Sequence, residues 1–213
     1  MTELHITQLP YVTPDIEVIG TYLEEHTQEH PINTVNWQAY PYTPEVHFWT
    51  AYNKDSLFIH YKVQEDYTKA IHTDNNSEVH KDSCVEFFVS PIDEYYFNFE
   101  FNAIGTKYAA RRKSRQEYQF LDQNSLDRIE TFSSLGNTPF SEVQLKDKWT
   151  LTIKIPLDIL WIDRLPSKGD CFRANFYKCG DELTQAHFLT WSEINTPEPD
   201  FHRPEYFGKV ILE

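Results

Sequence analysis

The sequence predicts an all-β protein, an antiparallel β-sandwich of the jelly-roll or immunoglobulin-like type with one or two short helices. Several stretches alternate apolar and polar residues with a period of two, and turn-forming residues separate them. Aromatic residues, which suit a half-buried pleated surface, make up 15% of the 213 residues. A parallel α/β fold would need a long helix after most strands, and the gaps between the alternating stretches lack one.

The first element expected is a helix near the N-terminus. Thr13 is suited to cap it, and Pro14 is suited to the first helical position. Its apolar residues follow the helical spacing of three and four: Ile16, Ile19 and Leu23. Gly20 weakens the helical pattern at its centre. A second short helix is expected within residues 121–135.

The remaining elements are expected to be strands. Their apolar members are Leu57, Ile59, Tyr61 and Val63; Val85, Phe87 and Val89; Phe97, Phe99 and Phe101; Trp149, Leu151, Ile153 and Ile155; Phe172, Ala174 and Phe176; and part of the closing segment 208–212. Turn residues fall between them, for example at 53–55, 102–105 and 168–170. No repeat or linker divides the chain, so residues 1–213 are expected to form one domain.

Two of these strands carry unusual polar residues opposite their apolar face. One strand has Asn98, Glu100 and Asn102, and the other has Asn175 and Tyr177. Amides, carboxylates and phenols offer directional donors and acceptors that suit the hydroxyl groups of a polyol. The alternative is an ordinary solvated sheet face with cross-strand polar pairs.

Composition excludes several classes of function. The 19 basic and 33 acidic residues give a net charge of −14, which argues against nucleic acid or an anionic membrane as the main partner. No apolar stretch approaches the roughly 18 residues of a membrane span. The three cysteines predict no disulfide framework. The N-terminal residues carry no signal-peptide pattern, so a cytoplasmic location is the default, and an extracellular or periplasmic one would follow if a leader had been removed.

Motifs for catalysis or metal binding are weak. The chain has no Gly-x-Ser-x-Gly, no His-Glu-x-x-His and no Cys-x-x-Cys motif. Asp74, Glu78 and Asp82 lie in one loop and are candidate ligands of a structural calcium ion. The alternative is an acidic surface loop in an acidic protein. No other cofactor is indicated.

The strongest local feature is aromatic. The segment His187–Trp191 is followed by residues 200–208, which contain proline, histidine and several aromatic residues. A tryptophan at the end of a strand, next to such a loop, could offer a flat face on which a pyranose ring packs. The alternative is a core tryptophan beneath a long loop.

Four blocks of the sequence together resemble a known family. They are AY at 51–52 with LFIHYKVQED at 57–66; DSCVEFF at 82–88; YFNFEFN at 96–102 with Gly105; and RANFYKCG at 173–180 followed by Trp191 and FG at 207–208. In order and spacing the chain resembles the carbohydrate-binding module family 9-like domains, a group related to the sugar- and haem-binding DOMON domains. The resemblance covers about residues 37–213.

The resemblance implies a non-catalytic domain that recognises plant or bacterial glycans of the xylan or glucan type. Some members grip a sugar between two tryptophan rings, with a carboxylate, an amide and an arginine bonding its hydroxyl groups. By motif position Trp191 corresponds to one ring, Glu86 to the carboxylate and Asn175 to the amide. Either Arg111 or Arg112 corresponds to the arginine.

The second tryptophan of the family is missing from the loop before residue 82, and His80 occupies the corresponding stretch. The candidate sugar-binding residues are therefore Trp191, Glu86, Asn175, Tyr177, Arg111, Arg112, Asn98, Glu100 and His80. No catalytic residue is assigned. Association with a glycoside hydrolase is a further expectation, since related chains are often attached to such enzymes.

Two alternative functions remain open. One is a glycoside hydrolase of the endo-xylanase kind, or a component of one, for which Glu86 and Glu100 are the carboxyl pair to examine. The other is a protein-interaction domain that has lost its sugar site, an interpretation motivated by the missing tryptophan.

Overall fold

The structure, a computed structural model, is a sandwich of two curled layers of strands, and it describes residues 2–10, 15–161 and 164–213. The first sheet contains β10 (Tyr118–Phe120), β9 (Lys107–Arg112), β8 (Tyr95–Asn102), β7 (Cys84–Ile92), β14 (Cys171–Cys179) and β16 (Gly208–Leu212), in that order. In the same sheet, β15 (Phe188–Thr190) pairs with β14, and β3 (Thr34–Val35) pairs with β15. The second contains β4 (Glu45–Tyr52), β5 (Ser56–Gln64), β13 (Trp149–Pro156) and β11 (Glu130–Ser133), with β2 (His30–Pro31) on β4.

Strand β1 (Glu3–Gln8) joins the two layers. Its first part pairs with β16 and its last two residues pair with β4. Both pairings are parallel, whereas the other strand pairs described are antiparallel. The sequence-based prediction of an all-β sandwich with short helices is confirmed, and the parallel pairing of β1 is the one departure from an antiparallel arrangement among the described pairs.

The main core lies between the two sheets and is rich in aromatic rings. The expected alternation holds: Phe87, Phe99 and Phe176 point inward and are fully buried. Phe176 stacks on Phe48 of the opposite sheet with ring centroids 4.0 Å apart. Burial of these large apolar surfaces, rather than intrinsic strand propensity, holds the layers together.

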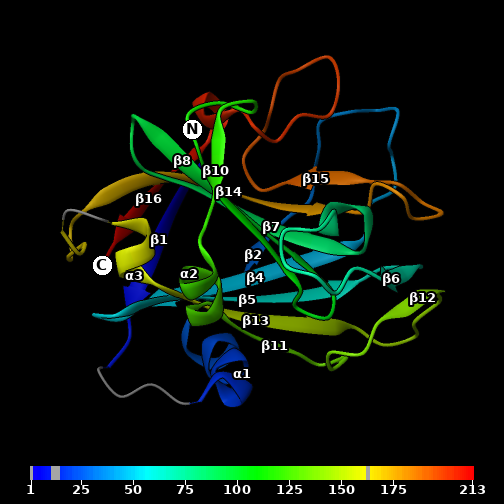
Figure 1. Cartoon of the computed structure of the whole chain (residues 1–213), viewed down its shortest axis with the longest axis horizontal. Helices are drawn as coiled ribbons and strands as arrows, with labels where there is room; N and C mark the ends of the chain where they lie inside the picture. Colours follow the sequence, from blue (N-terminus) through cyan, green and yellow to red (C-terminus); the bar gives the residue numbers. More distant parts are fainter. Residues whose placement is uncertain (1, 11–14, 162–163) are drawn as a thin grey trace.

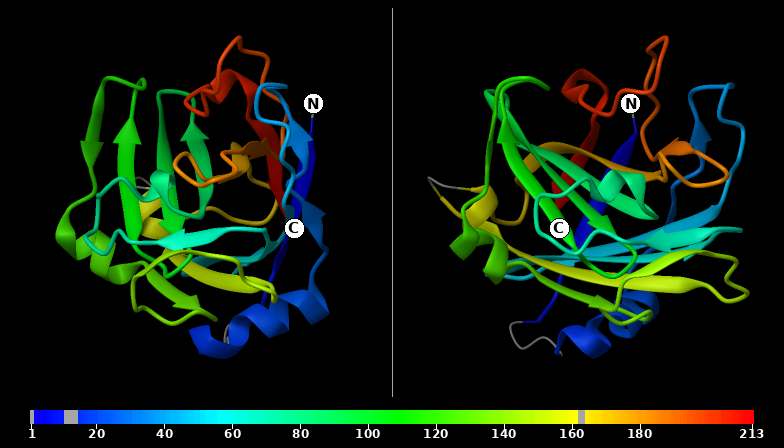
Figure 2. Two further views of the ribbon diagram at one scale, coloured as in Figure 1. Left: turned by 90° about the vertical axis from the view of Figure 1, so that its right-hand side faces the viewer. Right: turned by 45° about the vertical axis from the view of Figure 1, so that its right-hand side comes forward.

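Three α-helices are described, and α1 (Ile16–His26) covers the outer face of the second sheet. Figure 2 shows this helix outside the sandwich, next to β13 and β11. Ile19 and Leu23 pack against Trp49 and Phe58, which explains the helical spacing seen in the sequence. The helix begins after Asp15, and the expected cap at Thr13 and Pro14 lies outside the described residues.

Gly20 allows α1 to approach the sheet closely. A Cβ atom at this position would lie 2.5 Å from Nδ1 of His60 and 2.7 Å from Oγ1 of Thr152, two buried groups that hydrogen-bond to each other. We expect Gly20→Ala to destabilise the protein by about 1–3 kcal/mol, against the usual helix-propensity gain of alanine, because the packing has no space for a methyl group. Urea unfolding measures this, with Val18→Ala at an exposed site of the same helix as the control. A stabilised Gly20→Ala protein would contradict the packing argument.

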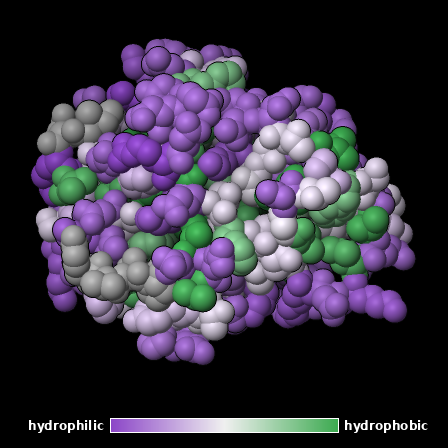
Figure 3. All heavy atoms as spheres, turned by 60° about the horizontal axis from the view of Figure 1, so that its bottom comes forward, coloured by the Kyte–Doolittle hydropathy of each residue, from purple (hydrophilic) through white to green (hydrophobic). Residues whose placement is uncertain are grey.

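The remaining helices and strands are short. They are α2 (Gln123–Arg128), α3 (Leu157–Leu160), the 3-10 helices η1 (Val79–Lys81) and η2 (Pro204–Tyr206), and the separate pair β6 (Thr68–Ala70) and β12 (Phe140–Val143). Helix α2 confirms the second expected helix. Within the described residues, no helix has the length and apolar character needed to cross a membrane. The face that carries α1 is largely hydrophilic, with apolar side chains in small separate groups (Figure 3).

Candidate functional site

Four side chains from adjacent strands form one row on the outer face of the first sheet. Tyr177 of β14 lies opposite Glu86 of β7, Glu86 opposite Glu100 of β8, and Glu100 opposite Tyr108 of β9. Directly paired residues of antiparallel strands project to the same side of a sheet, so the register brings two carboxyl groups together. The neighbouring residues of each strand point into the main core, as the sequence alternation predicts.

Loops cover this face and leave a cavity of about 200 Å³ over the row. Its walls come from η1, the strands β7, β8 and β9, the end of β14, and the segment 199–202. The lining residues are His80, Glu86, Phe88, Glu100, Tyr108, Arg112, Arg115, Cys179, Asp181, Phe188, Pro199, Asp200, Phe201 and His202. Loops therefore cover the polar surface that the sequence predicted to face solvent. This covering explains why its residues are buried.

The two glutamates of the cavity are nearly buried. Glu86 is 3% exposed and Glu100 is 6% exposed. Burial, together with the nearby Glu100, raises the pKa of Glu86 well above its usual range. The Glu86 carboxyl accepts a hydrogen bond from the Cys179 thiol (3.1 Å), and Glu100 accepts one from the Asn98 amide (2.9 Å). A protonated Glu86 can both donate to and accept from a ligand.

Of the two arginines predicted from the sequence, Arg112 is the one that reaches the cavity. Its guanidinium donates to Oδ1 of Asn98 (2.7 Å), to the carbonyl of Arg115 (2.7 Å) and to the Tyr108 hydroxyl (2.8 Å). A guanidinium has five N–H groups, so two remain for a ligand. Arg111 projects from the other side of β9, is exposed, and lies 3.9 Å from the ring centroid of Tyr95.

Two histidines line the cavity, and their pKa values are shifted in opposite directions. Nδ1 of His80 lies 3.7 Å from the Glu100 carboxylate, and this partner raises the pKa of His80. Burial, with Arg112 and Arg115 nearby, lowers the pKa of His202 to about 3, so its imidazole is neutral. The cavity therefore offers cationic donors, neutral donors and acceptors within a small volume.

Aromatic rings form the apolar part of the wall. Phe88 is buried, while Phe188 and Phe201 are half-buried. Phe201 stacks on Tyr177 with ring centroids 4.2 Å apart and an interplanar angle of 8°. Tyr177 is consequently covered, and its hydroxyl donates to the Phe201 carbonyl (3.2 Å). The flat apolar surface in the cavity comes from phenylalanine.

Trp191 lies away from the cavity. Its indole packs on the backbone of Gly208, where a Cβ atom would lie 2.4 Å from the ring, and it contacts Phe48 and Phe176 edge to face. The ring is half-buried against the main core. Trp191 therefore does not form the flat surface that the sequence analysis placed at the rim of the polar face. The segment after Trp191 folds so that Gly208 lies against the indole, and the Trp191 amide donates to the carbonyl of Phe176.

Two of the predicted amides serve the structure around the cavity. Asn175 is fully buried, and its side chain bonds both the N–H (2.8 Å) and the carbonyl (2.9 Å) of Ser192. Asn98 is also fully buried and bridges Arg112 and Glu100. Of the nine predicted sugar-binding residues, the cavity lining includes Glu86, Glu100, Arg112 and His80.

The candidate calcium ligands do not come together. Oδ2 of Asp82 accepts hydrogen bonds from the backbone of Ile71 and His72 and from the Asn102 amide. Asp74 and Glu78 are exposed, and Glu78 pairs with a lysine. Among the described residues, these three form no group of closely spaced donors.

Sequence reasoning missed several residues of the cavity. Tyr108 follows the apolar–polar alternation only weakly, and Asp181 sits in a glycine-containing turn. Phe201 and His202 belong to the aromatic segment 200–208, which the sequence pattern did single out. Their place in the site depends on how that loop folds back over β14, and this has no local signal.

Comparison with known proteins identifies the family of the chain. A model of carbohydrate-binding family 9 matches residues 19–212. The chain belongs to carbohydrate-binding family 9. The fold of this family 9 chain also matches a crystal structure of a candidate carbohydrate-binding protein from Bacteroides uniformis ATCC 8492, with 35% identity, a TM-score of 0.93 and 99% of each chain covered. No functionally curated protein matches the chain.

More distant relatives share the family 9 fold. A family 9 module from Caldicellulosiruptor kristjanssonii, solved in complex with glucose, is 14% identical, has a TM-score of 0.61, and the match covers 100% of this chain and 96% of that one. Another structure of a module from this organism, with cellotriose, is 13% identical, has a TM-score of 0.58, and the match covers 100% and 94%. The predictions of a family 9-like fold and of a carbohydrate-binding role are confirmed at the level of the family.

Proposed function

We propose that the cavity over Glu86 and Glu100 binds a terminal sugar ring of a glucan- or xylan-type oligosaccharide. The observation that carries this proposal is the enclosure of Glu86, Arg112 and His80 together with Phe201 in one cavity. The module structures holding glucose and cellotriose support a sugar of this class.

The chemistry of the wall suits hydroxyl groups. Arg112 donates, the imidazole of His80 can donate through an N–H group, Glu100 accepts, and Glu86 does both. Because both signs of charge are present, a neutral ligand with several directional donors and acceptors fits better than an ion. Phe88, Phe188 and Phe201 supply apolar surface for the C–H groups of a pyranose.

The size of the cavity favours one ring. Its volume of about 200 Å³ is below the range of roughly 300–1,000 Å³ typical of pockets for drug-sized ligands. A long polysaccharide chain would therefore enter by its end. We expect affinity to come mainly from one terminal residue and to change little as the oligosaccharide lengthens.

The arrangement of the carboxyl groups favours binding over hydrolysis. Glycoside hydrolysis places two carboxyl groups on either side of the scissile bond, roughly 5–9.5 Å apart. Glu86 and Glu100 are directly paired neighbours on one face of a sheet, so both approach a ligand from the same side. Reducing-sugar release that is abolished by Glu86→Gln would support the hydrolase alternative instead.

The proposal is tested by replacing adjacent arginines. Calorimetric titration of the wild-type chain with cello- and xylo-oligosaccharides is expected to show one site per chain. We expect Arg112→Gln to weaken binding about 10- to 100-fold, since a hydrogen bond from a charged donor contributes roughly 1.5–3 kcal/mol. Arg111→Gln, on the opposite face of the same strand, is the matched control and is expected to bind like the wild type.

Three results would contradict the proposal. They are the absence of any titration heat with these sugars, equal loss in both arginine variants, and full affinity in a folded Arg112→Gln protein. Circular dichroism of each variant separates a loss of binding from a loss of fold, because Arg112 also supports Asn98 and Tyr108.

A further inference from the structure

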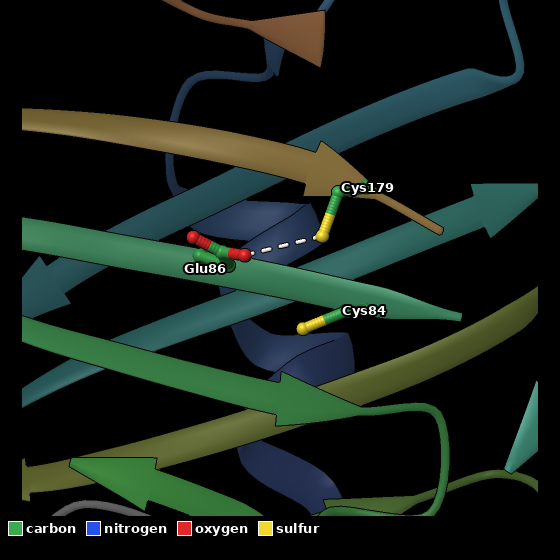
Figure 4. Close-up of side chains that lie close together, drawn as sticks. All are labelled: Cys84, Glu86 and Cys179. Carbon is green, nitrogen blue, oxygen red and sulfur yellow. Dashed lines mark hydrogen bonds between the residues drawn. The ribbon is translucent and has the colours of Figure 1, made fainter. Parts of the chain in front are cut away.

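Two buried cysteines and one carboxyl group converge beside the cavity. Cys84 of β7 lies directly opposite Cys179 of β14, and Glu86 follows on the same face of β7 (Figure 4). Both sulfur atoms and a carboxylate oxygen lie within 4.8 Å of one another. In the part of the chain that the structure describes, this is the one group of three such donors at this spacing.

We propose that Cys84, Cys179 and Glu86 bind a single zinc ion. Zinc prefers thiolate, imidazole and carboxylate ligands, and three protein ligands with one open position are typical of zinc sites that accept an exchangeable ligand. This donor set does not suit calcium, which takes oxygen ligands only. The two cysteines are far apart in the sequence, so no local sequence motif predicts the site.

The distances between the three donor atoms are close to those of a tetrahedral zinc site. With zinc–sulfur bonds of about 2.3 Å, two sulfur ligands lie about 3.8 Å apart. The Cys179 sulfur and the Glu86 oxygen are 3.1 Å apart, about 0.5 Å closer than a tetrahedral site would hold them. All three donor atoms lie within 4.8 Å of one another, so changes of about 1 Å or less are needed, which rotation of the side chains can supply without moving the strands.

Burial favours the protonated, uncharged forms of the three ligand side chains. The side chains are 0%, 1% and 3% exposed for Cys84, Cys179 and Glu86. Burial raises the pKa of Cys84 to about 12 and raises those of Cys179 and Glu86 well above their usual ranges. The ion would displace the two thiol protons and the carboxyl proton, leaving a complex with a net charge of −1, in which Glu86 no longer donates a hydrogen bond to a sugar but its second oxygen can still accept one. The positive charge of the buried Lys178, which forms an ion pair with Glu65, also lies near enough to favour the charged forms of Cys84 and Glu86.

An ion can reach the cluster through the cavity. Cys179 and Glu86 both line it, and so does the His80 imidazole. A water molecule from the cavity would supply the fourth ligand. The neighbouring aromatic side chains Tyr108, Phe188 and Phe201 pack around the two sulfurs and exclude bulk solvent on the other sides.

Cobalt and zinc titrations of the full chain, reduced with a phosphine and freed of metal, test the site in the absence of sugar. One equivalent of Co²⁺ is expected to produce a thiolate-to-cobalt charge-transfer band, and one equivalent of Zn²⁺ to abolish it. Cys84→Ser and Cys179→Ser are expected to lose the band. Cys171→Ser, which removes the exposed cysteine at the start of β14, is the matched control and is expected to keep it.

A second measurement keeps the test decisive if a serine variant fails to fold. Calorimetry of the wild-type chain in two buffers of different ionisation enthalpy counts the protons released, and at least two are expected per zinc ion. No band in the wild type, a band lost only with Cys171, or release of fewer than two protons would overturn the proposal. Because no sugar is present, these results stand apart from those that test carbohydrate binding.

Discussion

Replacing Lys178 by methionine is expected to destabilise the protein by about 3–5 kcal/mol. Nζ of Lys178 lies 2.8 Å from the Glu65 carboxylate, and both side chains are fully buried. The lysine also donates to the carbonyl of Cys179, and it lies 2.9 Å from Nε2 of His187. Loss of the ammonium would leave the Glu65 charge buried without its partner, which costs far more than a surface ion pair contributes.

This ion pair connects the two sheets behind the cavity. Lys178 belongs to β14 of the first sheet, whereas Glu65 follows β5 and accepts a hydrogen bond from Nε1 of Trp149 in β13 (2.9 Å). Burial, together with the charge of Lys178, keeps the pKa of His187 well below its usual range, so its imidazole stays neutral. The expected loss is a large fraction of the roughly 5–15 kcal/mol that stabilises a typical domain.

Guanidinium unfolding followed by circular dichroism measures the effect. Lys154→Met removes an exposed ion pair with Glu130 and is the matched control, with an expected loss below about 1 kcal/mol. The double variant Glu65→Leu/Lys178→Met is expected to recover most of the lost stability, because no unpaired charge remains. Equal stabilities of Lys178→Met and the wild type would show that the pair is unimportant.

Replacing Asn175 by alanine is expected to cost about 2–4 kcal/mol of stability. The amide oxygen accepts from the N–H of Phe176 and of Ser192, and the amide nitrogen donates to the carbonyl of Ser192. Truncation leaves two backbone groups of Ser192 buried without partners, at about 1–3 kcal/mol each. Because Ser192 begins the segment that leads to the cavity wall at 199–202, we expect this segment to open more often.

Hydrogen exchange and chemical unfolding distinguish this role from direct sugar contact. Asn175→Ala is expected to lower the free energy of unfolding and to speed amide exchange in residues 192–207. Asn195→Ala, at an exposed position of the same segment, is expected to change neither. A variant that unfolds like the wild type but binds sugar weakly would show that Asn175 contacts the ligand, as its motif position implies.

The periodicity of the strands predicted which side of the sheet each residue occupies. Glu86 and Glu100 alternate with inward-facing phenylalanines, so a one-residue shift would bury charge in the main core, and the pattern leaves only one choice of face. The strands containing these residues were predictable for this reason. The helix after residue 15 and the short helix within 121–135 were predictable from apolar spacings of three and four residues. Gly20 seemed unfavourable for a helix until the packing against His60 explained it.

Alternation could not predict which residues become neighbours. Arg111 and Arg112 were equivalent candidates in the sequence, and only the pairing of β9 with β8 places Arg112 on the cavity side. Trp191 looked like an exposed platform, yet the fold of the segment after it packs the indole on Gly208 and brings Phe201 over Tyr177 instead. The meeting of Cys84 with Cys179 likewise depends on the register of β7 and β14.

The sequence by itself determined the sandwich, the polar face and the family, because these follow from local periodicity and from motifs that are continuous along the chain. The tertiary structure decided that this face is enclosed, which residues line the cavity and which amides are structural. The physical reason is that strand register and loop closure bring together segments far apart in the chain, and their energies depend on packing that no single segment encodes.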